Sequence, residues 1–272
     1  MTESKITGRV LVETALLGCG LPSVSNQTLY EEWPKTKRIN LVWLQGGRIV
    51  SGPIEKFLDL RREAGWARVD ARRLDTAVAE QANGYLTASA VMKLTAGKLI
   101  PVVTGGMGGV RQDTISADLV YLTKSPALLI ASAPKDSVDL AGTVAYLREK
   151  GVLVLGVGQE YCDGFLFSRE KVWLDRAYSP DIIMSSVKLR AGCVIFNPLP
   201  PGLRFNEQSL LEKALEYSYE ASRRGQDFHP AVNHALDRLT GGRASVAQLE
   251  GLIANVKFAL SLPPMACAEN ST

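Results

Sequence analysis

The sequence is poor in the residues on which several common kinds of active site depend. It contains two histidines and four cysteines among 272 residues, and the cysteines lie far apart without a CxxC pair. A disulfide framework or a zinc site is not indicated, and reduced thiols in a cytosolic protein are expected. His229 and His234 are five residues apart, which does not place them on one helical face. We expect both to be ordinary helix residues, so that Glu, Asp and Lys carry any chemistry.

The sequence also lacks the features by which proteins bind membranes or nucleic acids. The first ten residues, MTESKITGRV, lack the apolar segment of a signal peptide, and no apolar run reaches membrane-spanning length. The net charge is +3, and no basic run carries interleaved aromatic residues. We therefore expect a cytoplasmic protein that binds neither a membrane nor nucleic acid.

What the sequence does contain is an alternation of strand and helix patterns. Short, β-branched apolar runs occupy residues 9–17, 38–47, 98–106, 127–133, 152–158 and 191–198. Helical patterns lie between several of them, at 74–97 (with a break near Gly84), 115–124 and 137–151. This alternation predicts an α/β fold in which helices flank a largely parallel sheet.

The pattern changes after residue 202. Three helical segments follow one another, at 209–225, 229–239 and 245–262, with no strand between them. We expect these helices to cover one side of the sheet. Because no linker or convincing boundary interrupts the chain, residues 1–272 are predicted to form a single domain.

A glycine-rich turn, TGGMGGV at 104–110, follows one of the predicted strands. Glycine permits a positive φ and close approach of backbone or ligand, and turn amides can hold an anion. A tight turn without a ligand is an equally good interpretation. The dinucleotide fingerprint GxGxxG fails, because Arg111 or Tyr161 stands at the sixth position, and no GxxxxGK[ST] motif exists. A Rossmann dehydrogenase or a P-loop enzyme is therefore disfavoured.

This turn and six further motifs resemble the pseudouridine-5′-phosphate glycosidase family. TGGMGGV followed by ISADL is similar to the family's TGGIGGVH and DISADL. In the same order stand VLVETALLGCGLP, LVWLQGG, GYLTASAVM, APKDSVD, FNPLP and LTGG. The resemblance covers nearly the whole chain. It implies a three-layer α/β/α domain, a homotrimer, and reversible cleavage of a C–C glycosidic bond to uracil and ribose 5-phosphate with a divalent metal, usually Mn²⁺.

The resemblance assigns catalytic roles to Lys135 and Glu13. Breaking a C–C glycosidic bond is difficult because the base leaves as a carbanion, and an imine between a lysine and C1′ of the opened ribose supplies an electron sink. Lys135 matches the imine-forming lysine, although a solvated loop lysine is the ordinary alternative. Glu13 matches the catalytic glutamate, which could transfer protons during ring opening and onto the departing base carbon. The alternative is a charged residue at a strand end.

The resemblance also assigns a metal ligand and substrate contacts. Asp118 matches the metal ligand, and one carboxylate can suffice for Mn²⁺ because this ion keeps several waters. The competing interpretation is that Ser116 caps a helix and Asp118 lies in its first turn, where the macrodipole stabilises an acid. Thr87, Thr104 and Ser116 match substrate contacts and could cradle the phosphate.

Four positions depart from the family pattern. Arg68 stands in place of a lysine near the substrate, and Gln248 in place of an asparagine that contacts it. Arg111 and Cys19 replace the histidines of TGGIGGVH and SHGMP. Arg68 still suits phosphate, but it cannot act as a base.

Since Lys135, Glu13 and Asp118 are kept while their surroundings change, we hypothesise an altered aglycone. The chain would then be a C-glycosynthase that joins ribose 5-phosphate to an aromatic or heteroaromatic carbon, like relatives of the family in natural-product pathways. A divergent pseudouridine-5′-phosphate glycosidase and a non-catalytic sugar-phosphate binding protein remain as alternatives.

Overall fold

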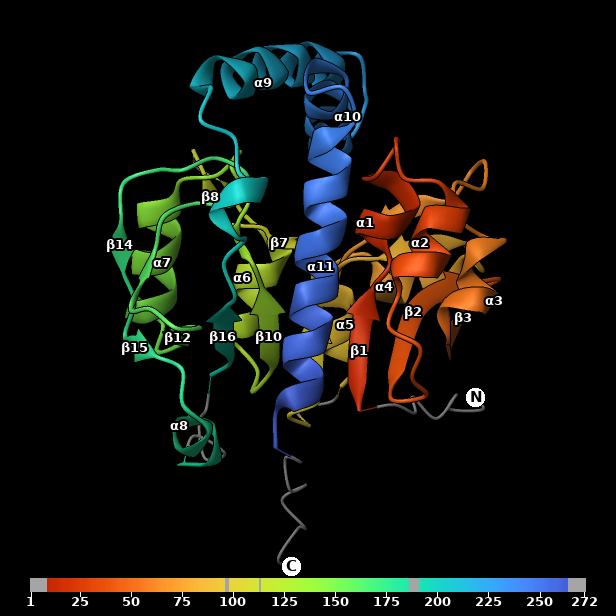
Figure 1. Cartoon of the computed structure of the whole chain (residues 1–272). Helices are drawn as coiled ribbons and strands as arrows, with labels where there is room; N and C mark the ends of the chain where they lie inside the picture. Colours follow the sequence, from red (N-terminus) through yellow and green to blue (C-terminus); the bar gives the residue numbers. More distant parts are fainter. Residues whose placement is uncertain (1–8, 96–97, 113, 186–190, 264–272) are drawn as a thin grey trace, which may run out of the picture.

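The computed structural model describes residues 9–95, 98–112, 114–185 and 191–263, and most of its strands form one sheet (Figure 1). Nine strands follow in the spatial order β15 (Arg176–Ala177), β12 (Leu153–Gly156), β16 (Cys193–Phe196), β10 (Leu128–Ala131), β6 (Pro101–Val103), β1 (Val10–Glu13), β2 (Ile39–Gln45), β5 (Gly84–Leu86) and β4 (Ala67–Val69). The tenth, β3 (Arg48–Gly52), pairs with β2. Neighbours from β15 to β2 are parallel, whereas β2 runs antiparallel to β3 and β5.

Both faces of this sheet are buried. Along β10, Leu129 and Ala131 join one hydrophobic cluster, while Leu128 and Ile130 join another on the opposite face. The first cluster is covered by α4 (Leu74–Ala79), α5 (Ala88–Leu94), α6 (Ala117–Leu122) and α7 (Leu140–Glu149). The second is covered by α1 (Ala15–Cys19), α2 (Asn26–Glu32), α3 (Ile54–Leu58) and α11 (Arg243–Ser261). The predicted three-layer α/β/α fold with a largely parallel sheet is confirmed.

The helical pattern at 74–97 is broken near Gly84, as expected, and strand β5 occupies the break, because β5 pairs with β2 and Tyr85 packs in the core opposite Trp43. One expectation about the later helices was wrong, since α9 (Gln208–Arg223) and α10 (Phe228–Leu239) do not cover a side of the sheet. They form a hairpin beyond the carboxyl ends of strands such as β1, and only α11 runs along the sheet (Figure 1). Tertiary pairing overrides the local pattern in both cases.

Short elements extend the carboxyl edge of the sheet. β7 (Gly106–Met107) pairs with β11 (Ala133–Pro134), β8 (Val110–Arg111) with β9 (Thr114–Ile115), and β13 (Tyr161–Cys162) with β14 (Val172–Trp173). The remaining helices are α8 (Pro180–Ser185) and a 3₁₀ turn at Pro201–Leu203. None of the helices in the described ranges has the length and apolar character needed to cross a bilayer.

Candidate active site

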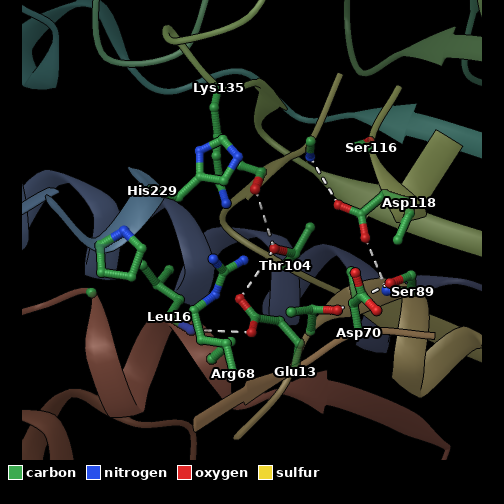
Figure 2. Close-up of a pocket in the computed structure, with 18 of the residues that line it drawn as sticks. Glu13, Leu16, Arg68, Asp70, Ser89, Thr104, Ser116, Asp118, Lys135 and His229 are labelled. Atoms are coloured by element: carbon green, nitrogen blue, oxygen red, sulfur yellow. Dashed lines mark hydrogen bonds between the residues drawn. The ribbon is translucent and has the colours of Figure 1, made fainter. Parts of the chain in front are cut away.

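A cavity of about 220 Å³ opens at the carboxyl edge of the sheet (Figure 2). It lies where β1, β6 and the β7–β11 pair end, and α10 contributes to its wall. All but one of the predicted site residues line it, namely Glu13, Arg68, Thr87, Thr104, Ser116, Asp118 and Lys135. Residues from four of the seven motifs, together with Arg68, are thus brought together.

The glycine turn exists because side chains approach it closely. Its glycines have no positive φ, so that part of our rationale was wrong. A Cβ on Gly106 would lie 2.9 Å from the Phe165 ring and 3.1 Å from Cγ of Lys135, and a Cβ on Gly108 would lie 2.6 Å from Cβ of Ser116. The turn therefore makes room for the side chains of the site.

Lys135 is fixed to the glycine turn through its backbone. Its N–H donates to the Met107 carbonyl at 2.9 Å, directly after the short β7–β11 pairing. The side chain lines the cavity and does not point into bulk solvent (Figure 2). Burial, followed by the nearby Arg68 guanidinium, lowers the pKa of Lys135, against the raising effect of the Asp118 and Glu13 carboxylates. The free amine is thereby favoured.

Glu13 is a buried carboxyl at the end of β1. Its Oε2 accepts the Leu16 N–H at 3.1 Å, and its Oε1 accepts the Thr104 hydroxyl at 3.2 Å. Burial raises the pKa of Glu13, although Lys135 and Arg68 act in the opposite direction. A raised pKa keeps the proton on a carboxyl to higher pH, which suits a general acid.

Asp118 joins two parts of the cavity wall. Its Oδ1 accepts the Ser89 N–H at 2.9 Å and its Oδ2 accepts the Gly108 N–H at 2.8 Å (Figure 2). Ser116 is the N-cap of α6 and accepts the Leu119 N–H. The capping interpretation is thus confirmed, and Asp118 has a structural role whatever else it binds.

The donor atoms in the cavity fit a hydrated divalent cation. Each oxygen of Asp118 accepts one N–H and keeps a lone pair, and Asp70 also lines the cavity. Within the described ranges no three His, Cys, Asp or Glu side chains could enclose an ion. The site suits a cation on Asp118 that keeps most of its waters.

Polar side chains from several elements could contact a sugar phosphate. Thr87 and Thr104 are buried, and the Thr87 hydroxyl lies 3.0 Å from the Ser89 hydroxyl. Arg68 projects into the cavity (Figure 2). Gln248, by contrast, does not line this cavity. It lies on α11 beside a smaller cavity of about 20 Å³ behind Lys135, and its Nε2 has no hydrogen-bond partner among the residues that the structure describes.

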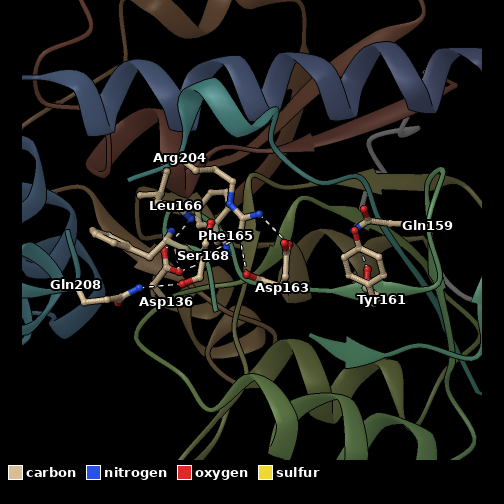
Figure 3. Close-up of polar contacts among 10 residues, drawn as sticks. Asp136, Gln159, Tyr161, Asp163, Phe165, Leu166, Ser168, Arg204 and Gln208 are labelled. Atoms are coloured by element: carbon tan, nitrogen blue, oxygen red, sulfur yellow. Dashed lines mark hydrogen bonds and ion pairs between the residues drawn. The ribbon is translucent and has the colours of Figure 1, made fainter. Parts of the chain in front are cut away.

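Asp136, the neighbour of Lys135, faces away from the cavity into a dense hydrogen-bond network (Figure 3). Its carboxylate accepts the N–H groups of Phe165, Leu166 and Phe167 at 3.3, 2.9 and 3.3 Å. Arg204 binds the same loop through an ion pair to Asp163 at 2.8 Å. This network holds Phe165 beside Gly106 and Lys135.

Sequence reasoning missed two residues of this region. His229, expected to be an ordinary helix residue, lines the cavity from α10, and no local pattern pointed to it. Asn255 on α11 is fully buried and donates to the Thr104 carbonyl at 2.8 Å and the Ser132 hydroxyl at 3.1 Å. An asparagine flanked by apolar residues, in the run LIANV at 252–256, is a signal that could have identified it.

Comparison with known proteins agrees with the motif resemblance. The model of the family described as indigoidine synthase A-like proteins matches residues 36–263. The chain belongs to this family. Pseudouridine-5′-phosphate glycosidases of Thermus thermophilus and Saccharopolyspora erythraea are 27% and 26% identical to it. These alignments cover 92% and 93% of this chain and 95% and 91% of the relatives. The chain is thus a divergent member of the indigoidine synthase A-like family.

Two solved structures share the fold. An indigoidine synthase A-like protein of Thermotoga maritima superposes with a TM-score of 0.78 at 26% identity, over 92% of this chain and 90% of that one. The prealnumycin C-glycosynthase AlnA, solved with ribulose 5-phosphate, has a TM-score of 0.73 at 21% identity, over 92% and 88% of the two chains. The second likeness bears on the fold alone.

Proposed function

We propose that this protein forms or cleaves the C–C bond between C1′ of ribose 5-phosphate and an aromatic or heteroaromatic ring. One observation carries the proposal. Burial pushes Lys135 toward its free amine and Glu13 toward its neutral acid, within one cavity. A nucleophilic amine and a proton donor are the two groups that imine formation with a ring-opened sugar needs.

The mechanism begins with the sugar. In the open form of ribose 5-phosphate, the Lys135 amine adds to the C1′ aldehyde, and Glu13 gives a proton to the departing oxygen, so that water leaves and an imine remains. The ring carbon of the aglycone then attacks C1′, and the C=N electron pair moves onto the lysine nitrogen. Once the aglycone ring has lost its proton, the C4′ hydroxyl oxygen closes onto C1′, the C1′–N bond breaks, and the hydroxyl proton passes to the released Lys135 amine. In the cleavage direction the same bonds break in reverse order.

Other residues bind and orient the substrate. We assign the phosphate to Arg68 with the hydroxyls of Thr87, Thr104 and Ser116, because guanidinium and hydroxyl groups are good phosphate donors. Asp118 would hold a divalent cation, Mn²⁺ for instance, which supplies positive charge near the sugar oxygens when bound. Its two N–H bonds to the cavity wall fix the carboxylate in place.

Synthesis with an altered aglycone is the direction we favour. Cys19 lines the cavity where the similar motif carries a histidine, so a polar group of the cavity wall differs while Glu13, Asp118 and Lys135 are kept. Burial raises the pKa of Cys19 to about 11, so it contributes a neutral thiol and not a thiolate nucleophile. AlnA shows that this fold accommodates a pentulose 5-phosphate in another protein.

Cleavage of pseudouridine 5′-phosphate is the second candidate. It is supported by the curated relatives in Thermus thermophilus and Saccharopolyspora erythraea, which carry that name and align over most of this chain. A protein that only binds a sugar phosphate is disfavoured, because binding alone requires neither a lysine whose pKa is lowered nor, beside it, a carboxyl whose pKa is raised.

A product screen tests the proposal. The protein is incubated with ribose 5-phosphate and Mn²⁺ together with uracil or one of a panel of electron-rich phenols, and C-ribosyl phosphates are sought by mass spectrometry. A C-ribosyl phosphate of a phenol supports synthesis, and one of uracil alone supports the glycosidase alternative. Sugar-phosphate binding that survives a combined Lys135→Ala and Glu13→Ala change, with no turnover of any partner, would establish the binding protein instead.

A further inference from the structure

The proposed chemistry leaves one proton without a carrier. When an aromatic carbon attacks C1′, that carbon becomes tetrahedral and must lose its hydrogen to restore the ring. Lys135 is consumed as the imine, and each oxygen of Asp118 already accepts an N–H. Glu13 is bound to Leu16 and Thr104 and acts on the sugar oxygen. A second base on the aglycone side would spare Glu13 from serving both the sugar oxygen and the ring carbon.

His229 stands where such a group is needed. It projects from α10 beside Lys135 (Figure 2), and it lines both the main cavity and the small cavity behind Lys135. Its Nδ1 lies 3.4 Å from the Ser137 hydroxyl, and its Nε2 has no hydrogen bond to any described residue. The Phe228 ring packs edge-on against the imidazole, with 5.6 Å between centroids. One ring nitrogen is thus available to a bound ligand.

We propose that His229 is the general base that takes the ring proton of the aglycone in the bond-forming step. This inference rests on the proposed function. The aglycone carbon gives an electron pair to C1′, and the C=N pair moves to the Lys135 nitrogen. The C–H pair then returns to the ring while the proton passes to Nε2, leaving an imidazolium. The required tautomer has Nδ1–H donating to the Ser137 hydroxyl.

Electrostatics favour this direction of transfer. Burial, followed by Lys135 where its amine is protonated and by the Arg68 and Arg111 guanidinium groups, holds the pKa of His229 well below its usual range, while the carboxyl groups of Glu13, Asp118 and Asp70 lie in the same cavity. The imidazole is therefore neutral at neutral pH and can accept a proton. A proton on a tetrahedral carbon of an aromatic ring is acidic, so a weak base suffices. Cleavage would need the scarce imidazolium form.

The surroundings of His229 also explain two departures in the sequence. Arg111 and Cys19 occupy positions where the similar motifs carry histidines, so those loops supply no imidazole here. The Arg111 guanidinium instead stacks over the Phe228 ring at 3.9 Å, next to His229. The cavity thus receives its imidazole from the α9–α10 hairpin.

The experiment compares His229→Ala and His229→Gln with His234→Gln, a change at an exposed histidine on the same helix. Ribose 5-phosphate is supplied with uracil or with 1,3-dihydroxybenzene as the aglycone probe. Borohydride trapping on Lys135 reports imine formation, and mass spectrometry reports the C-ribosyl phosphate. We expect both His229 variants to form the adduct normally but to make product about 10²–10⁴-fold more slowly. Added imidazole should partly restore His229→Ala, and His234→Gln should behave as wild type.

The outcomes separate this inference from the function on which it rests. Normal product formation by both His229 variants would overturn the role of His229 and leave the lysine chemistry standing. Equal losses of adduct and product, with no rescue by imidazole, would assign His229 to binding or folding and would also overturn it. Absence of adduct and product in the wild-type protein with both probes would contradict the proposed function, and the inference with it.

Discussion

Glu13 and Asp136 are both buried carboxyls at the carboxyl edge of the same sheet, yet their surroundings differ. The Asp136 carboxylate accepts three backbone N–H groups, and the backbone carbonyl of Asp136 accepts a hydrogen bond from the Arg169 guanidinium. Glu13 accepts one N–H and one hydroxyl and faces a cavity. Burial raises the pKa of both residues. The perturbed pKa therefore does not separate the two carboxyls, whereas the contacts and the cavity do.

This difference assigns the two acids to different tasks. The hydrogen bonds of Asp136 are directed into the protein and hold the loop that carries Phe165 (Figure 3). Glu13 has a side open to a ligand and lies in one cavity with the amine of Lys135. A strongly shifted pKa marks a candidate functional residue only where a cavity accompanies it. The following predictions test this division.

The largest effect is expected from Glu13→Gln. Glutamine can still accept the Leu16 N–H, but it cannot give a proton, so product formation should fall by about 10²–10⁴-fold without loss of folded protein. Steady-state rates and circular dichroism provide the measurement. Glu32→Gln, at an exposed position, is the control and should leave the rate of product formation and the circular dichroism spectrum unchanged. Full activity of Glu13→Gln would remove the acid from the mechanism.

Asp136→Asn should have the opposite signature. The amide offers one acceptor oxygen where three N–H groups need partners, so the free energy of unfolding should fall by about 2–3 kcal/mol. Imine trapping per folded molecule should be preserved at a temperature where the variant remains folded. Chemical denaturation measures the stability, and the exposed Asp75→Asn is the control, expected within about 0.5 kcal/mol of wild type. Unchanged stability of Asp136→Asn together with a loss of imine trapping would show that Asp136 has a chemical role and not a structural one.

Arg68→Gln should shift the pH dependence of imine formation. Arg68 lowers the pKa of Lys135, so its removal raises that pKa and leaves less free amine at a given pH. The rate of imine trapping at saturating ribose 5-phosphate falls as the pH decreases, and the pH at which it falls should be higher in this variant. Arg68→Lys keeps the positive charge and should leave that pH unchanged, as should Arg73→Gln at an exposed position. A fall in the trapping rate that occurs at lower pH in Arg68→Gln than in the wild type would contradict the electrostatic account.

The smallest effect concerns stability as a function of pH. The pKa of Glu13 is raised in the folded state above its ordinary value of 4.5, so its ionisation at higher pH destabilises the fold. Glu13→Gln should therefore melt at a higher temperature than wild type at pH 8. This advantage should shrink as the pH falls toward 4.5. A constant difference across this range would show that Glu13 is not perturbed by burial.

Most of the fold was predictable because its strands are buried on both faces. Runs such as CVIF at 193–196 are continuous and apolar, and a parallel sheet requires such runs. Strand β5 was not predicted, because it has only three residues and lies inside a helical pattern. These residues form a strand because they pair with β2. The position of the α9–α10 hairpin depends on contacts between distant parts of the chain, which local periodicity does not encode.

The site was predicted through the family motifs and not through spacing. Glu13, Asp118 and Lys135 are far apart in the sequence, and only the order of the strands brings their side chains together. Gln248 was assigned from a motif position and lies in the neighbouring small cavity. His229 was dismissed because nothing local distinguishes it from His234, and the fold alone turns one toward the cavity while the other is exposed.

The central claim, that Lys135 forms an imine with C1′ of a pentose 5-phosphate, is tested most directly by reductive trapping. The protein is treated with borohydride in the presence of ribose 5-phosphate, digested and mapped by mass spectrometry, with Lys135→Met as the matched control. The account predicts one sugar-phosphate adduct, on Lys135, that is absent from the variant. An adduct on another lysine such as Lys93, or none on folded protein that binds the sugar phosphate, would contradict it.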